Sequence, residues 1–516
     1  MKILFWVPGG MKEILSVEGI IAKSLNFRGI ETHAIICDGK YCACVRREIF
    51  NGYSYNVWSD LCERCCENNT EVLKKLGIEY SYVGDYISLE EFDIARKLSQ
   101  QAKWDEIDSI EYHGINIGTN IKSSIYRYLQ GHRLEKCSDN VMQEYVFSAY
   151  INAIASKKAL DILKPEKLYM SHAIYVDWGP AVRMANKKGI PVIGWMSSYL
   201  ASNFYFKVIR NVDVIDMHNI DGDNWSNIVE DNLSDENRNR LNEYIKRRYL
   251  DNISFDMGKF SKYSELSIIK AKYSFDNINP TWAIFTHVNW DSVTDYAPML
   301  YKTFNEWIID TITIIKKIKN VNFIIKIHPA EKWSNKNGSG IEDLIRIKFT
   351  DLPNNVKLIG ADEKINPLNF YQMIDGGITV YGTAGLELSL FGKPVILAGT
   401  AHYGNKGFTY DANTIDEYKN LLMNTDKIAV LSETQIEYAK KYAYNYFIQR
   451  QIPLLIVKDD KTGWWKIHED RLDNLLPGKD LIIDFLCNKI ISDEEFIMDD
   501  EFLKKLEKEK YYEKYK

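Results

Sequence analysis

Apolar runs of strand length alternate with segments of helix type in two separate series along this chain of 516 residues. A strand, helix, strand order predicts parallel strands covered by helices, because parallel neighbours need a long crossover connection. The elements predicted for the first series are strands at 2–7, 32–37, 165–170 and 189–194, and helices at 13–26 and 180–188. The stretch between residues 42 and 158 has a mostly helical pattern with interspersed aromatic residues.

A second series of the same kind follows a polar stretch rich in Asn, Asp and Arg. Its predicted elements are strands at 282–286, 322–327, 356–359 and 394–397, helices at 301–319 and 384–391, and a turn at 375–377. Two such series in tandem predict an α/β fold with two Rossmann-like domains that face each other across a cleft. We assign residues 1–270 to an N-terminal domain with helical insertions, 271–440 to a C-terminal domain, and 441–516 to a helical segment with a charged tail.

The composition is that of a globular enzyme, with 46% hydrophobic and 26% charged residues. A net charge of -6 creates no field that would attract a nucleic-acid backbone, so we expect no nucleic-acid partner. Pro8 interrupts the apolar start of the chain, and no stretch offers the about 18 uncharged apolar residues of a membrane helix. We therefore expect a cytoplasmic protein. The alternating charges at 499–516 predict a solvated surface, with docking to an anionic membrane as the alternative.

Six of the eight cysteines lie between residues 37 and 66. Thiolates two or three residues apart can bind one tetrahedral zinc ion, and Cys42, Cys44, Cys62 and Cys65 have this spacing. A zinc site on these four residues is one interpretation. The other is that they are small buried thiols near the first sheet, where free cysteines usually lie.

The segment 379–395 combines a strand end, a loop of small and hydroxyl residues, a helix start, and a Gly-Lys-Pro entry into the next strand. The amides and the positive dipole end of a helix N-terminus favour a phosphate, so Tyr381, Gly382 and Thr383 are candidate binding residues. Glu387 lies one turn further, where a carboxylate can accept two hydrogen bonds from a ribose diol. In the alternative, Thr383 only caps the helix and Glu387 only stabilises its first turn.

The apolar strand at 322–327 ends in Lys326-Ile-His328-Pro and is followed by Glu331. Side chains at the carboxyl end of a parallel strand point into the ligand crevice, and the proline fixes the loop. An imidazole in this position can protonate a leaving phosphate or neutralise its charge, so we assign His328 a catalytic role. Lys326 and Glu331 flank this residue and are assigned to the same binding site. A purely structural His328 is the alternative.

Two other predicted strand ends carry polar residues. Thr286, His287 and Asp291 follow the first strand of the second series and are assigned to contacts with the phosphates or the sugar of a nucleotide-sugar donor. In the alternative, His287 and Asp291 bond each other and order the loop. Attack by a sugar hydroxyl needs a base, which we expect in the first domain. The candidate bases are His172, Asp177 and Asp38.

These residues resemble those of bacterial capsule and surface polysaccharide biosynthesis proteins, the group that includes the Kdo transferases, within the two-lobed GT-B glycosyltransferases. The resemblance covers roughly the second domain and rests on the motifs at 326–331, 381–387 and, more loosely, 286–291. It implies that His328 contacts the donor phosphate, that Thr383 assists and that Glu387 holds the ribose. The His-Pro element is similar to one in transferases that use CMP-activated acidic sugars.

The resemblance implies a glycosyltransferase that passes a sugar from a nucleotide donor to a surface polysaccharide or glycan acceptor. A CMP-activated acidic sugar, such as Kdo or a sialic-acid-like sugar, is favoured. UDP and GDP donors stay open, because Cys37-Asp38-Gly39 has one acid where such sialyltransferases have two. No donor-site loop carries an Asp-x-Asp motif, so we expect a metal-independent reaction that needs no cofactor beyond the donor.

Further expected contacts are the inner surface of the membrane and other glycan-assembly proteins. Three alternative functions stay open: a polyol-phosphate (glycerophosphate-type) transferase of wall polymer assembly, a sugar-nucleotide epimerase, and a non-catalytic glycan-assembly protein. The first should carry a strongly basic acceptor groove, and the sequence shows no such bias. An epimerase needs no acceptor.

Overall fold

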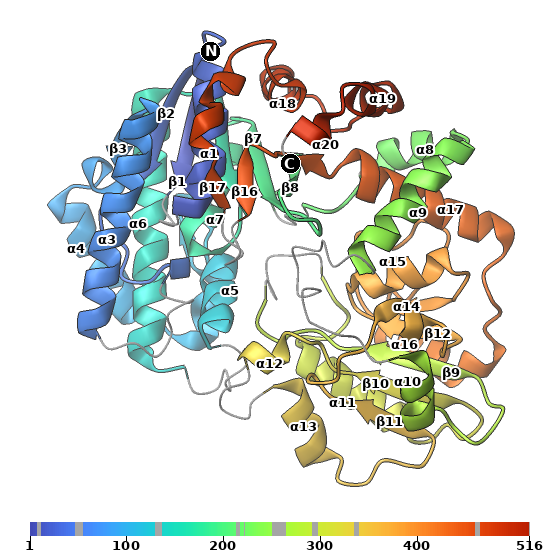
Figure 1. Cartoon of the computed structure of the whole chain (residues 1–516). Coiled ribbons are helices and arrows are strands. Elements are labelled where there is room, and N and C mark those ends of the chain that lie inside the picture. Colours follow the sequence, from blue (N-terminus) through green and yellow to red (C-terminus); the bar gives the residue numbers. More distant parts are fainter. Residues whose placement is uncertain are drawn as a thin grey trace.

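The computed structural model describes residues 1–7, 12–46, 55–129, 137–212, 217–220, 222–249, 265–291, 298–334, 340–459 and 465–514. Within these parts the chain forms two α/β domains, each built on a mainly parallel sheet that is covered by helices (Figure 1). The predicted α/β class with two Rossmann-like domains, the arrangement of the GT-B type, is confirmed.

The sheet of the N-terminal domain has seven strands. Five of them, in the order β3-β2-β1-β6-β7, are parallel, and the order of the strands reverses between β1 and β6 as in a Rossmann fold. The sheet continues with β8 and β15, and β8 is antiparallel to both of its neighbours. The strands are β1 (Lys2–Val7), β2 (Glu31–Ile36), β3 (Glu79–Tyr82), β6 (Lys167–Ser171), β7 (Val192–Ser197), β8 (Asn203–Ile209) and β15 (Ile452–Pro453).

Helices cover both faces of this sheet. On one face α1 contacts α3 and α18, and on the other α6 contacts α7, α4 and α5. The helix α6 spans 25 residues, and its middle is buried between the sheet and its neighbouring helices. The helices are α1 (Lys12–Asn26), α3 (Tyr55–Leu76), α4 (Leu89–Gln101), α5 (Gly118–Leu129), α6 (Asp139–Leu163), α7 (Tyr175–Lys187) and α18 (Leu481–Ser492).

The sheet of the C-terminal domain has six strands, all parallel, in the order β11-β10-β9-β12-β13-β14. Its order reverses between β9 and β12. The strands are β9 (Thr281–Phe285), β10 (Asn322–Lys326), β11 (Val356–Ile359), β12 (Gly376–Thr379), β13 (Val395–Leu397) and β14 (Tyr410–Asp411). The helices that follow or connect them include α11 (Phe304–Ile315), α12 (Glu331–Ser334), α13 (Ile341–Lys348), α14 (Pro367–Tyr371), α15 (Thr383–Leu390), α16 (Ile415–Met423) and α17 (Glu433–Tyr444).

The turn predicted at residues 375–377 is wrong, because β12 begins at Gly376. A Cβ atom on Gly376 would lie 2.7 Å from the ring of Trp282, and one on Gly377 would lie 2.5 Å from Leu388. The two glycines therefore let a strand pack tightly between β9 and α15. A glycine pair of this kind marks close packing of backbone against side chains rather than a change of chain direction.

The helix predicted to begin at Pro180 begins at Tyr175 instead. A proline inside a helix has no N–H for the carbonyl four residues earlier, which here belongs to Val176. The side-chain amide of Asn152, on α6, donates to this carbonyl over 2.7 Å. A residue from a distant part of the chain thus replaces the missing hydrogen bond and lets the helix start one turn earlier.

The segment from residue 441 onward, which the sequence separates from both domains, returns to the N-terminal domain. After α17 a π-helical turn, Asn445–Gln449, leads to β15, which pairs with β8. Buried residues of α18, α19 (Asp500–Lys508) and α20 (Tyr511–Lys514) belong to the same hydrophobic core as β1 and α1. Figure 1 shows these helices in red at the top of the molecule, with α19 above the green helices α8 and α9.

Two helices, α8 (Gly222–Glu230) and α9 (Asp235–Tyr249), lie between the domains in sequence and pack on α17.

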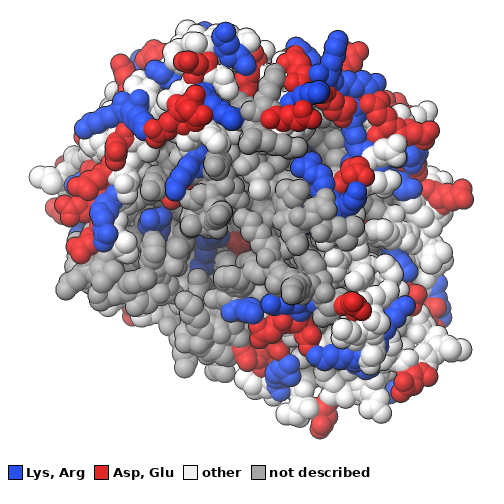
Figure 2. Space-filling model, viewed as in Figure 1, with Lys and Arg blue, Asp and Glu red and all other residues white. Residues whose placement is uncertain are grey.

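On the face shown in Figure 2, basic and acidic side chains are interspersed. In the parts of the chain that the structure describes, no helix combines the length and the apolar character needed to cross a bilayer.

Candidate functional site

The carboxyl ends of the strands in the two sheets face each other. Tyr175 follows β6, and its hydroxyl donates to Asp291, which follows β9, over 3.0 Å. Tyr199 follows β7, and its hydroxyl accepts from Thr383, at the start of α15, over 3.3 Å. Ligands of open α/β sheets bind beyond the carboxyl ends of the strands. The region between these loops is therefore the candidate active site.

His287 joins the two loops at which the strand order of the second sheet reverses. Its Nε2 accepts hydrogen bonds from the backbone N–H groups of Val380 and Tyr381, at 3.3 and 3.1 Å. The ring stacks on Phe304 at 4.8 Å between centroids. Burial, with a smaller effect of His328, lowers the pKa of His287 to about 3. The neutral ring carries its proton on Nδ1 and fixes the loop after β12.

The turn into α15 is held without a side-chain cap. Gly382 is the N-cap residue and Thr383 the first residue of the helix, so the interpretation of Thr383 as the cap is wrong. The Tyr403 hydroxyl donates to the carbonyl of Gly382 over 2.5 Å. A Cβ atom on Gly385 would lie 2.1 Å from the same hydroxyl oxygen, so only glycine fits there. The N–H of Gly385 bonds the Gly382 carbonyl over 2.9 Å. The N-terminus of a helix can attract an anion, and phosphate binding at this turn stays a prediction.

His328 follows β10, next to β9, and its ring orientation is set by backbone groups. The N–H of His328 donates to Thr286 Oγ1 over 2.9 Å, and the N–H of Ala330 donates to His328 Nδ1 over 3.1 Å. Because Nδ1 accepts, the neutral ring carries its proton on Nε2. The side chain is half-buried. Thr286 and His328, each predicted as a site residue, therefore lie together, and the Nε2–H of His328 can act as a proton donor.

Lys326 and Glu331 support this loop from its buried side. Glu331 is 3% exposed and accepts from the N–H groups of Ile341 and Glu342 at the start of α13, over 2.9 and 3.0 Å. Burial raises the pKa of Glu331 to about 7. Burial also lowers the pKa of Lys326 to about 8, and its Nζ donates to the Ile327 carbonyl over 3.1 Å. Contacts of both residues with a donor stay a prediction.

Glu387 lies inside a cluster of side chains that the sequence did not indicate. Its carboxylate accepts from the hydroxyl of Tyr371 over 2.6 Å and from that of Tyr249, and Arg248 Nη1 lies 3.1 Å away. The Arg248 guanidinium stacks on the ring of Tyr199 at 4.2 Å. Glu387 itself is 2% exposed. Its role in ribose binding stays a prediction, and its contacts join α9 to α15.

Asp291 bonds the first domain rather than His287. Arg127, on α5, donates to Asp291 Oδ1 over 2.7 Å and to the Tyr175 hydroxyl over 2.8 Å. The Arg127 guanidinium also lies over the ring of Tyr175, at 4.9 Å from its centroid. The alternative that His287 and Asp291 bond each other is thus wrong. Asp291 instead links the loop after β9 to α5 and α7.

The segment after β6 has an unusual backbone. His172, Ala173 and Tyr175 have φ angles of 54°, 64° and 60°, a left-handed conformation that side chains disfavour. Strain of this kind clusters at functional sites, where the surrounding structure maintains it. The His172 ring stacks on Trp178 at 5.2 Å. Burial and the nearby Arg127 cation lower the pKa of His172 to about 4, so its ring is neutral near pH 7.

The two acids proposed as bases lie in different places. Asp177 is 1% exposed, and its Oδ2 accepts from the Val45 N–H over 3.1 Å. Burial raises the pKa of Asp177 to about 7. Asp38 follows β2 and accepts from the Gly84 N–H over 3.2 Å, and burial raises its pKa. His172 and Asp177 both follow β6, whereas Asp38 follows β2, which is separated from β6 by β1.

The predicted zinc ligands are not gathered. Among the residues that the structure describes, no three His, Cys, Asp or Glu side chains are arranged to hold a metal ion. Cys62 and Cys66, one turn apart on α3, instead meet Cys37 at the end of β2, and the Cys66 thiol bonds both. Cys65 also lies near Cys37 and Cys62 and accepts from Asn69 over 4.0 Å. Residues three and four apart lie on the same side of a helix, so Cys62, Cys65 and Cys66 share one side of α3, and the predicted set with Cys42 and Cys44 is not formed within the described residues.

Residues 240–444 match the model of a family described as "Capsule polysaccharide biosynthesis protein". This is the family indicated by the resemblance of the sequence motifs. The matched span contains β9 to β13 and with them His287, His328 and the α15 turn. No curated protein matches the chain in sequence.

Several solved structures resemble the chain at a distance. The β-Kdo 2,4 transferase of Thermosulfurimonas dismutans KpsC has 14% identity and a TM-score of 0.36, covering 60% of this chain and 86% of that one. The β-Kdo 2,7 transferase of the same protein has 12% identity and a TM-score of 0.33, covering 62% and 88%. UDP-GlcNAc 2-epimerase from Neisseria meningitidis has 12% identity and a TM-score of 0.26, covering 86% and 98%. At these TM-scores none of the three carries an argument about function.

Proposed function

We propose that this chain, in which residues 240–444 match the capsule polysaccharide biosynthesis family, is a glycosyltransferase that uses a nucleotide-sugar donor and a surface polysaccharide or glycan acceptor. One observation carries the proposal. His287 fixes the α15 turn at the point where the strand order reverses, and His328 follows the adjacent strand with its proton on Nε2. A phosphate-binding helix terminus and a proton donor thus share one sheet edge.

The donor phosphate would bind at the N-terminus of α15. The N–H groups of its first turn and the helix dipole attract an anion, and Thr383 places a hydroxyl beside them. Ligand phosphates bind in this way at switch points of α/β sheets. A CMP-activated acidic sugar is the favoured donor because of the His-Pro element, with UDP and GDP sugars as the other candidates.

His328 would act on the leaving group. When the bond between the sugar and the phosphate breaks, negative charge develops on the phosphate oxygen. The Nε2–H of His328 can donate to that oxygen or transfer its proton to it, while Nδ1 is held by the N–H of Ala330. The dipole of α15 and this imidazole would together stabilise the charge, which supports a metal-independent reaction.

The acceptor would bind on the side of the first domain. His172 is the candidate base that fits best, because its ring is neutral near pH 7 and it follows β6, at the strand ends that face the second domain. As the acceptor oxygen forms its bond to the sugar, His172 would take the hydroxyl proton. Asp177 is 1% exposed and is better placed to support this segment. We place the reaction on the cytoplasmic side of the membrane.

Thermal unfolding in the presence of CMP, UDP, GDP and CDP, each with EDTA, tests this proposal. A nucleotide that binds only the folded state stabilises it by about 2.7 kcal/mol at 100 times its Kd. One nucleotide should raise the Tm clearly above the others. A polyol-phosphate transferase would favour CDP, and a protein without a donor site would respond to none of the four.

A further inference from the structure

Helix α9 spans the distance between the C-terminal helix α19 and the proposed donor site. Its first two turns contact α19, and its last turn carries Arg248 and Tyr249, which contact Glu387 on α15. Arg240 and Arg248 are eight residues apart, which is about 12 Å along a helix. A stiff helix of this length can pass a shift at one end on to the other end.

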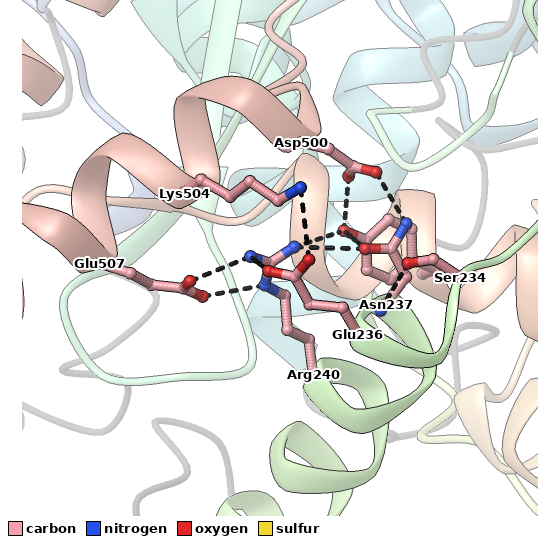
Figure 3. A network of polar contacts seen from close by, with 8 residues as sticks. Ser234, Glu236, Asn237, Arg240, Asp500, Lys504 and Glu507 are labelled. Carbon is pink, nitrogen blue, oxygen red and sulfur yellow. Dashed lines mark hydrogen bonds and ion pairs between the residues drawn. The ribbon is translucent and has the colours of Figure 1, made fainter.

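The contact between α9 and α19 is centred on Arg240 (Figure 3). Its guanidinium forms two parallel hydrogen bonds to Glu507, at 2.9 and 3.0 Å, and a third to Glu236 at 2.6 Å. The remaining nitrogen donates to Asn237 at 3.2 Å and to Tyr444 at 3.5 Å. The side chain is 12% exposed. A paired fork of this kind fixes orientation as well as distance.

A second set of contacts fixes the start of α19. The Asp500 carboxylate accepts from Asn237 and from the Tyr444 hydroxyl, both over 2.7 Å, and Lys504 pairs with Glu236 at 3.3 Å. Leu503 and Leu506 are buried beneath the helix, at 6% and 1% exposure. The charged tail that the sequence assigned to a solvated or membrane surface is thus engaged, along α19, in contacts within the molecule.

The other end of α9 lies against the α15 turn. Arg248 is held between Glu387, one turn into α15, and the ring of Tyr199. Tyr199 in turn accepts from the Thr383 hydroxyl at the first position of the helix. One partner of Arg248, Glu387, belongs to α15, and the other, Tyr199, contacts it. Arg248 binds both of them from α9.

We propose that Arg240 is a positioning residue for the donor site: α19 holds α9 through Arg240, and α9 holds Arg248 against Tyr199 and Glu387 at the α15 turn. The inference rests on the proposed function for its consequence, which is nucleotide affinity. Arg240 itself does not touch the donor. Loss of its contacts lets α9 shift, so that the α15 turn becomes less ordered and binds the donor phosphate more weakly.

The test compares Arg240→Ala and Glu507→Gln with Arg346→Ala, in the full chain. Arg346 pairs with Glu342 on the exposed surface of α13 at 2.7 Å and serves as the control for loss of one ion pair. Hydrogen exchange of residues 381–390 is measured without ligand, and nucleotide affinity by calorimetry with the nucleotide that stabilises the wild type. We expect faster exchange in both α19-contact variants and about tenfold weaker binding, equivalent to about 1.4 kcal/mol.

The order of action is tested by the double variant Arg240→Ala, Arg248→Ala. If Arg240 acts through Arg248, the double variant binds the nucleotide about as weakly as Arg248→Ala alone. Additive losses, or wild-type exchange and affinity in a folded Arg240→Ala protein, overturn the inference. A wild-type protein that binds no nucleotide overturns the proposed function instead, and the exchange data then still decide whether Arg240 orders the turn.

Discussion

His287 Nε2 lies 3.1 Å from the backbone nitrogen of Tyr381 and accepts its hydrogen bond, and this bond joins the loops after β9 and β12. These are the loops at which the second sheet reverses its strand order. The bond needs an unprotonated Nε2. The geometry of the donor site therefore depends on a histidine that stays neutral in the folded protein.

The pKa of His287 predicts a pH dependence of stability. Its pKa is about 3 in the folded state, whereas an unfolded histidine titrates near 6.5. The unfolded state binds more protons between these values, so this contribution is complete above about pH 6.5 and falls as the pH drops towards 3. His287→Gln retains an acceptor oxygen but does not titrate. Denaturant unfolding between pH 7 and 5 should show a shallower loss of stability for this variant, and equal slopes would refute the assignment.

The contact between Gly385 and Tyr403 predicts a pairwise rescue. In Gly385→Ala the new methyl group would meet the Tyr403 hydroxyl at 2.1 Å and displace the α15 turn. We expect a loss of stability of about 1–3 kcal/mol, the usual cost of overpacking, together with weaker nucleotide binding. Adding Tyr403→Phe removes the oxygen and should restore part of the stability. A double variant no more stable than Gly385→Ala would argue against this contact.

The cysteine cluster predicts unequal thiol reactivity. A hydrogen bond from Cys66 lowers the pKa of Cys62 to about 7, whereas burial raises the pKa of Cys65 to about 12. The thiolate is the reactive form, so at pH 7.5 iodoacetamide should modify Cys62 well before Cys65. Peptide mapping by mass spectrometry measures both rates. Cys66→Ala removes the hydrogen bond and should slow modification of Cys62; an unchanged rate would contradict the arrangement.

The proposed base predicts the acidic limb of the pH profile. A base must be unprotonated, and the pKa of His172 is about 4. Transfer should therefore persist below pH 6 and fall only near pH 4, in the kcat/KM of the free enzyme. His172→Asn should lower kcat by about 10²-fold or more and leave nucleotide affinity intact, because His172 lies in the other domain. If Asp38→Asn lowers kcat by this factor and His172→Asn stays active, Asp38 is the base instead of His172.

Local patterns were enough to predict four of the six strands of the second domain, β9, β10, β11 and β13, and its main motifs. The runs ending at His328 and at the α15 turn combine apolar strands with residues that suit a strand end, so both features are visible within a few residues. The start of α7 at Tyr175 was not predictable in this way, because it depends on Asn152 from another helix. Gly376 gave a wrong prediction for the same reason, since the residue against which it packs, Trp282, lies nearly a hundred residues away.

The residues that complete the site come from distant segments. Three side chains reach the α15 turn from other elements: Tyr199 from the loop after β7, Arg248 from α9 and Tyr403 from the loop after β13. None of them follows a recognisable motif. Their roles arise from the tertiary contacts alone. The cysteines show the reverse case: their spacing predicted a metal site that the described residues do not form, because Cys66 bonds Cys37 and Cys62 instead.

The central claim is that a nucleotide-sugar donor binds at the α15 turn and is activated by His328. The most direct measurement is the release of free nucleotide from CMP-, UDP- and GDP-sugars by the wild type and by His328→Ala, in EDTA. We expect the wild type to release one nucleotide and His328→Ala to release it more slowly by about 10²-fold or more, with the fold intact. Equal rates for both proteins, or no release and no nucleotide binding by the folded wild type, would contradict the account.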